Sequence, residues 1–268
     1  MAGTDDAVGD DDALYVLTAV LLTPAQFPSV LGDDFPAACA SLGLEAYTQG
    51  YGLVLGQDGK GARWTVVVDD VSLVAVAIAS WDCGMEYDLS PSDRSVVTAL
   101  PGWPLAVATS APGLPAPHDP DEEDGGGAPL TPPDTDAWGP AQRRLGADAV
   151  ALQWATWRQQ VADSVTFVQP DAPEEERAEP HEGVRRVLKE ARGYVDDAPP
   201  IGRVRSGFAP DGARMLRADG PGWSLVARTD DIAFVLMDEE PGEVLPVGRG
   251  PELPGLLAAL ESMAVHPS

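Results

Sequence analysis

The sequence predicts an α+β protein built from two similar sub-domains, each an antiparallel β-meander with helices packed on one face. Two observations carry this prediction. Apolar alternation and glycine-containing turns recur in both halves of the chain, which is typical of strands joined by hairpins. In addition, GARWTVVVDDVSLVAVA at residues 61–77 is partly repeated by PGWSLVARTDDIAFVLM at residues 221–237. The repeat is consistent with an internal duplication, although antiparallel strands also converge on such patterns without common origin.

The N-terminal half is expected to begin with a short helix, because apolar residues between 14 and 21 share one helical face and Pro24 ends it. A second helix is predicted over residues 36–44, where Gly43 can close it. The segment SPSDRSVVTALPG, residues 90–102, is expected to form another helix capped by a serine. Strands are expected at residues 51–55, 63–68, 71–80 and 105–109.

The C-terminal half is expected to open with a long helix over residues 141–165, because Val150, Trp154, Trp157 and Val161 form one apolar stripe. A further helix is predicted at residues 183–194, and a leucine-rich closing helix at residues 252–263. Between these two helices the pattern changes to strands, at residues 202–208, 213–217, 223–228, 232–237 and 243–247.

Composition divides the chain into four parts. Residues 1–12 are acidic and are expected to be disordered, and residues 13–109 form the N-terminal α+β domain. Residues 110–140 are rich in proline, glycine and aspartate, so they cannot offset their ordering entropy and are expected to form a flexible linker. Residues 141–264 form the C-terminal α+β domain.

Charge is the extreme property of this sequence, because 43 acidic side chains oppose 17 basic ones and give a net charge of −26. Such a chain repels nucleic acid and anionic membranes, so neither is an expected partner. It attracts a basic protein partner. A charge of this kind is equally typical of a protein that is merely kept soluble or that comes from an acidic proteome. Lysine occurs only at Lys60 and Lys189, which indicates a high-GC genome such as that of an actinobacterium.

A cytoplasmic location is expected, because the N-terminus is acidic where a secretory signal is basic and no apolar run is long enough to span a bilayer. The two cysteines, Cys39 and Cys83, are then expected to remain buried thiols without a disulfide.

The residues that usually carry catalysis are scattered. His118, His181 and His266 fall in a linker, a loop and a tail, which argues against a metal cage or a histidine-dependent triad. The glycine-rich segment at residues 52–61 lacks the ending of a phosphate-binding loop, and Glu252 occupies the helix start after Arg249. No catalytic, metal-binding or cofactor-binding residue is therefore predicted, and no cofactor is expected.

Candidate partner-binding residues come from the tryptophans and from the Asp-Asp steps of the repeat. Trp154 and Trp157 lie on one helix face and fit either a core or a binding ridge, and the linker does not require Trp138 to be buried. Adjacent aspartates on a strand point to opposite faces, so a hairpin turn suits these pairs better than a chelating site. The candidates are Trp138, Trp154, Trp157, Asp69, Asp70, Asp230 and Asp231.

The leading functional hypothesis is a non-catalytic, acidic, cytoplasmic protein-binding module, such as an adaptor, a chaperone or an immunity-type inhibitor, that engages a basic protein. The order of helices, meander and closing helix in each half is similar to that of actinobacterial ESX secretion-associated chaperones. That resemblance in architecture implies a type VII secretion chaperone that binds helical export substrates. Two further alternatives stay open: a carboxylate-dependent enzyme with a site between the halves, and a virion or assembly component.

Overall fold

A computed structural model describes residues 14–25, 34–72, 74, 94–106, 111–125, 127–164 and 181–266. The chain divides into two compact units. Unit 1 comprises Met1–Leu31 and Tyr47–Pro133, and unit 2 comprises Gly32–Ala46 and Asp134–Ser268. Unit 1 contains a four-stranded antiparallel sheet and unit 2 a five-stranded one, and each unit also contains helical segments. This confirms the predicted α+β class.

Unit 1 contains a four-stranded meander in the order β1-β2-β3-β4. Every neighbouring pair is antiparallel. A short turn at residues 58–62 joins β2 to β3, whereas long segments, residues 23–50 and 69–95, connect β1 to β2 and β3 to β4. Valines and an alanine fill a small core on one face of this sheet. The strands are β1 (Tyr15–Leu22), β2 (Tyr51–Gln57), β3 (Arg63–Val68) and β4 (Val96–Pro101).

Two predicted helices of the N-terminal half are wrong. The apolar segment near residue 14 forms β1 and pairs with β2, since a short apolar run fits either period. The segment expected to be helical at residues 90–102 contains β4, where Val96, Val97 and Thr98 are β-branched and favour a strand. In the predicted strand at residues 71–80, Val71 and Ser72 are helical rather than extended, and residues 75–80 lie outside the described residues. In the predicted strand at residues 105–109, Leu105 and Ala106 belong to no strand, and residues 107–109 lie outside the described residues.

Unit 2 contains a five-stranded meander in the order β5-β6-β7-β8-β9 and confirms the predicted strand positions. Its strands are β5 (Val204–Phe208), β6 (Arg214–Gly220), β7 (Trp223–Arg228), β8 (Ala233–Met237) and β9 (Leu245–Val247). Its helices are α1 (Phe35–Ser41), α4 (Pro140–Leu152), α5 (Trp154–Ser164), α6 (Glu182–Asp196) and α7 (Leu253–Met263). The single long helix predicted from residue 141 is interrupted at Gln153, which ends α4 before α5 begins.

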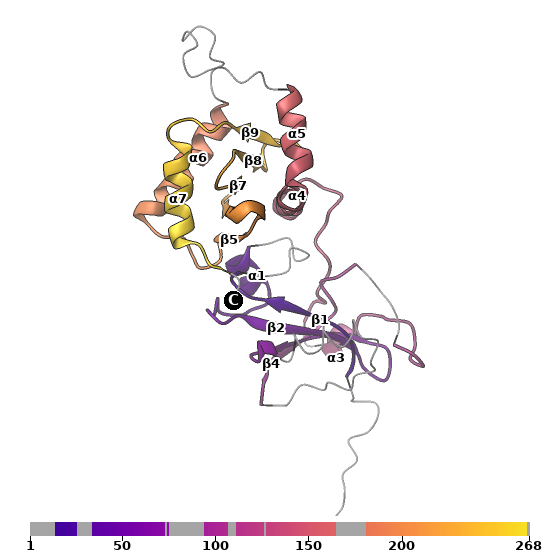
Figure 1. The fold of residues 1–268 in the computed structure, drawn as a ribbon. Helices are drawn as coiled ribbons and strands as arrows, with labels where there is room; N and C mark the ends of the chain where they lie inside the picture. Colours follow the sequence, from indigo (N-terminus) through magenta and orange to yellow (C-terminus); the bar gives the residue numbers. More distant parts are fainter. Residues whose placement is uncertain are drawn as a thin grey trace, which may run out of the picture. The chain divides into compact units, whose positions relative to one another are not determined.

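Helices of unit 2 lie on both faces of its sheet, so the predicted packing on one face is not confirmed. Figure 1 shows α6 and α7 on one side of β5–β9 and α4 with α5 on the other. Successive side chains of β7 point to opposite faces of the sheet, which explains this arrangement. Trp223 and Leu225 pack with α6 and α7, whereas Val226 packs with α4 and α5. Trp64 and Trp223 both lie near the start of the third strand of their sheets, and a duplication stays a prediction.

The linker prediction falls on a segment that makes backbone contacts in unit 1. His118 pairs with Ala62, and Leu130 pairs with Gly102. The short helix α3 (Glu122–Gly125) lies between these two contacts. No helix among the described residues is long and apolar enough to cross a membrane.

Candidate functional site

Trp154 and Asp231, two of the predicted partner-binding residues, lie together in unit 2. Trp154 begins α5 and Asp231 lies in the turn between β7 and β8. The indole Nε1 of Trp154 donates to Asp231 Oδ2 at 3.4 Å, and Arg158 Nε lies 3.0 Å from both carboxylate oxygens. The ring of Trp154 packs edge-on against Phe234 at 5.2 Å between centroids. These contacts fix Trp154 in the core and give the Asp231 carboxylate a defined ion-pair partner.

Trp138 and Trp157 are half-buried at the edge of the same core. Trp138 Nε1 donates to the backbone oxygen of Met237 at 3.0 Å, so its polar atom is satisfied internally. Both rings pack against the buried cluster that contains Val226 and Phe234. Each keeps part of its surface exposed, which leaves it available for a partner.

The aspartate pairs occupy different local environments. Asp230 is half-exposed, and its carboxylate accepts from Arg228 Nε at 2.6 Å. This hydrogen bond is the main reason why the pKa of Asp230 is lowered. Asp69 and Asp70 belong to unit 1, are exposed and follow β3 directly, where Asp70 Oδ1 accepts from the backbone nitrogen of Ser72 at 3.0 Å. The predicted hairpin turn is therefore found at Asp230–Asp231, whereas Asp69–Asp70 precede a helical turn.

His181, His266 and Cys39 occupy structural positions in unit 2. His181 Nε2 lies 3.2 Å from Glu240 Oε1, and His266 Nδ1 lies 2.7 Å from an Arg214 nitrogen. Cys39 is buried in α1, and burial raises the pKa of its thiol to about 11, so it is a poor nucleophile near neutral pH. Among the described residues, no group of three or more His, Cys, Asp or Glu side chains is arranged to hold a metal ion.

A buried network of arginines and aspartates lies within unit 2, and no local pattern in the sequence indicates it. Its centre is Asp219 on β6, which is fully buried. Ser224 Oγ donates to this carboxylate at 2.6 Å, and nitrogens of Arg205, Arg217 and Arg143 lie 3.3, 3.7 and 3.8 Å from it. The surrounding positive charges compensate the loss of hydration that burial imposes on the carboxylate.

The titration of Asp219 reflects this environment. Burial by itself would raise the pKa of Asp219, but the charges of Arg217, Arg205 and Arg144 outweigh it and hold the pKa at about 2. Burial in turn lowers the pKa of Arg205 to about 10. Asp219 is therefore ionised at neutral pH despite its complete burial.

A second centre of the network is Asp34, which precedes α1. Its Oδ1 accepts from the backbone nitrogen of Ala37 at 2.9 Å and caps the helix. Its Oδ2 accepts from Arg144 of α4 at 3.2 Å and from Arg203 before β5 at 3.0 Å. One carboxylate thus joins three separate segments of unit 2.

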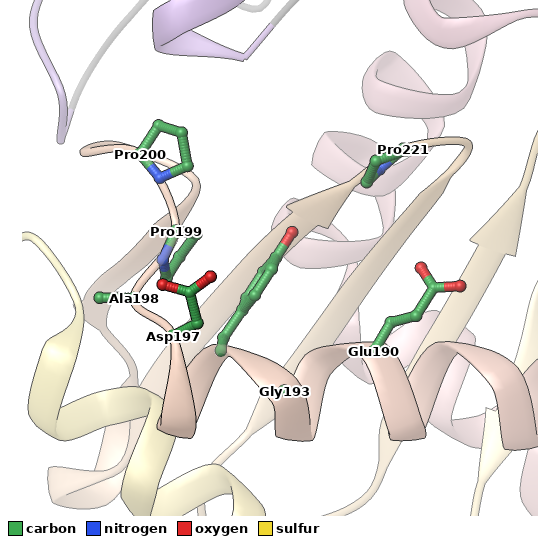
Figure 2. Close-up of a pocket in the computed structure, with 8 residues that line it drawn as sticks. Glu190, Gly193, Asp197, Ala198, Pro199, Pro200 and Pro221 are labelled. Atoms are coloured by element: carbon green, nitrogen blue, oxygen red, sulfur yellow. The ribbon is translucent and has the colours of Figure 1, made fainter.

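A hollow of about 360 Å³ lies at the C-terminal end of α6. Figure 2 shows Glu190 on α6 and Asp197 directly after its last residue, with Gly193 between them. The hollow is lined by two carboxylates, an aromatic ring and several prolines, and no lysine or arginine lines it. Its lining residues are Glu190, Gly193, Tyr194, Asp197, Ala198, Pro199, Pro200 and Pro221.

No predicted site residue lines this hollow. The sequence signal for the hollow was the acidic end of α6, Asp196-Asp197, followed by Ala-Pro-Pro. Pro221 lines the same hollow only because the turn between β6 and β7 brings it there.

Comparison of the chain with protein-family models, with curated proteins and with solved structures finds no match.

Proposed function

We propose that this chain is a non-catalytic, acidic protein-binding module that engages a basic protein partner. One observation carries the proposal: most arginines of the chain form ion pairs with carboxylates of the same chain. The arginines that form ion pairs within the chain are Arg63, Arg143, Arg144, Arg158, Arg186, Arg192, Arg203, Arg205, Arg214, Arg217 and Arg228.

The carboxylates greatly outnumber these arginines, because the chain holds 43 acidic and 17 basic side chains. Several exposed carboxylates, such as Asp136, Asp197 and Glu243, form no ion pair within the part of the chain that the structure describes. The surface available to a partner therefore carries the excess negative charge, which favours a positively charged partner and speeds its association.

The non-catalytic part of the proposal is supported by the way reactive groups are engaged. The carboxylate of Asp231 is paired with Arg158, and His181 and His266 lie against charged neighbours. Cys39 is buried with a raised pKa. These groups are held in structural contacts instead of converging on a concave site.

The test is affinity capture with the tagged full chain from its native host, followed by mass spectrometry. Recovered partners are expected to be enriched in basic proteins, and their recovery is expected to fall steeply as salt is raised through physiological ionic strength. Recovery of partners without basic bias and without sensitivity to salt contradicts the proposal.

A charge-neutralising variant distinguishes an effect of surface charge on capture from an effect of unfolding. Neutralising several exposed carboxylates, including Asp136→Asn and Glu243→Gln, is expected to weaken capture while leaving the unfolding transition in place. If capture persists unchanged at the same salt concentration, the negative surface is not what the partner recognises.

A further inference from the structure

The hollow at the end of α6 is negatively polarised by three separate features. Glu190 and Asp197 line it, and no basic side chain lines it or lies in the last turn of α6. In addition, the C-terminal end of a helix carries a partial negative charge from its free carbonyl groups.

Three arginines near the hollow are bound by carboxylates that do not line it. Arg186 lies 3.9 Å from Glu190 but is bound by two oxygens of Glu239 at 2.9 and 2.7 Å. Arg192, which precedes Gly193, pairs with Glu252 at 3.0 Å, and Arg203, whose charge acts on Tyr194, pairs with Asp34 at 3.0 Å.

Gly193 leaves the hollow open. It lies inside α6, where a glycine is less favourable than alanine because it loses more backbone entropy. A Cβ added at this residue would meet no atom within 4 Å, so packing does not require the glycine. Because Gly193 lines the hollow, a side chain at this residue would occupy space that the glycine leaves open. The glycine therefore preserves the hollow at a cost to the helix.

The polar groups of the hollow are fixed in place. Trp223 Nε1 donates to Glu190 Oε2 at 2.6 Å, and the hydroxyl of Tyr194 donates to the backbone oxygen of Asp219 at 2.9 Å. The rings of Tyr194 and Trp223 lie 5.8 Å apart between centroids. Burial raises the pKa of Tyr194, so its hydroxyl remains a donor throughout the physiological range. The aromatic wall and one carboxylate are thus preorganised for a ligand.

We propose that this hollow binds an arginine side chain of the partner. A guanidinium group is planar, stacks on aromatic rings and presents five donors to carboxylates and helix carbonyls. The prolines of the wall carry no N–H group, so they offer apolar surface for the arginine stem and no competing donor. This inference rests on the proposed function, because it assigns to the basic partner the side chain through which it is recognised.

The direct test is a titration of the full-length ¹⁵N-labelled chain with Nα-acetyl-L-arginine methylamide, followed by amide chemical shifts. Saturable shifts are expected at Gly193, Tyr194 and Ala198. The citrulline analogue has the same shape but no charge, and it is expected to produce no saturable shift because it cannot form charge-assisted hydrogen bonds. Equal responses to both compounds, or arginine shifts scattered over the acidic surface without saturation, overturn the proposal.

Substitutions of the hollow supply matched comparisons. Gly193→Leu fills the space and is expected to weaken binding of the arginine compound at least tenfold, roughly the loss of one charged hydrogen bond. Gly255→Leu is its control, since Gly255 is an exposed glycine of α7 whose added Cβ also meets no atom within 4 Å. Unchanged affinity in Gly193→Leu contradicts the proposal.

The double variant Glu190→Gln with Asp197→Asn removes two charges with little change in size. It is expected to weaken binding of the arginine compound about tenfold or more. The control Asp121→Asn with Glu122→Gln removes the same charge at two exposed carboxylates of unit 1 and is expected to leave the affinity unchanged. Equal weakening in both variants shows a diffuse charge effect and overturns the specific site.

The two proposals fail in different ways. If partner capture is basic and salt-sensitive but Gly193→Leu captures as well as the unmodified chain, the arginine site is wrong and the proposed function stands. If the arginine compound binds the hollow and capture shows no basic bias, the proposed function is wrong and the arginine site stands without it.

Discussion

Arg203 Nε donates to Asp34 Oδ2 at 3.0 Å, although 169 residues separate the two in the chain. Asp34 is almost fully buried, and Arg144 reaches the same oxygen. This contact attaches α1, a helix from the first part of the chain, to the residues of unit 2 that precede β5.

Asp34→Ala is expected to lower the free energy of unfolding by about 3 kcal/mol or more, because it leaves guanidinium groups without their buried partner and removes a helix cap. Asp34→Asn keeps an acceptor for the Ala37 nitrogen and removes only the charge, so it should be less damaging. Urea denaturation of both variants measures the difference. Equal and small losses in the two would show that the ion pair contributes little.

The buried Asp219 carboxylate should make the free energy of unfolding depend on pH in the acidic range. Its pKa is about 2 in the folded chain against 3.8 for the unperturbed group, so the folded state binds fewer protons than the unfolded state between these values. Stability from this carboxylate is complete above about pH 4 and is lost as the pH falls through 2, in an amount of about 2 kcal/mol.

The comparison with Asp219→Asn isolates this contribution. The variant should be less stable at neutral pH, and the difference in free energy of unfolding should shrink as the pH falls from 4 to 2. A difference that stays constant over this range would mean that Asp219 titrates identically in both states.

Replacing each of the two tryptophans of α5 with alanine should lower the free energy of unfolding by different amounts. Trp154→Ala is expected to lower the free energy of unfolding by about 3–5 kcal/mol, because the ring is buried against Phe234. Trp157→Ala should cost clearly less, since its ring is half-exposed. Leu152→Ala is the control, because Leu152 is 86% exposed and its loss should be within about 0.5 kcal/mol. Thermal unfolding distinguishes the three, and equal costs for both tryptophans would place Trp157 in the core.

Cys39 should resist thiol reagents in the folded chain. Its raised pKa of about 11 makes the thiolate roughly a hundredfold scarcer than at the ordinary value, and burial blocks access. In a Cys83→Ser background, a chromogenic disulfide reagent at pH 8 is expected to react only after urea is added. Rapid reaction under native conditions would show that α1 opens readily.

The strands of unit 2 could be predicted because their residues repeat one local pattern. β7 and β8 are short, almost continuous apolar runs separated by a turn at Thr229–Asp231, a pattern typical of buried strands joined by a hairpin, and this agrees with their pairing. β1 could not be predicted, because its apolar residues satisfy a helical period and only pairing with β2 decides between the two.

The buried network and the hollow depend on contacts between distant segments, which the local pattern does not contain. Asp219 looks like one of many aspartates until Arg143, Arg205 and Arg217 surround it. Of the predicted site residues, Trp154 and Asp231 are brought together because α5 crosses the turn that follows β7. The hollow could not be predicted from the sequence, because it depends on where Pro221 lies relative to α6.

The short segment that follows α7 restricts the motions of unit 2. Val265 exchanges backbone hydrogen bonds with Val204 and Ser206, so the chain returns from the helix to the β5 edge. On the other side, α7 follows β9 at the opposite edge of the same sheet. A helix anchored at both edges cannot swing away without breaking one of them. The slowest amide hydrogen exchange of the unit should therefore include α7, at rates set by global opening.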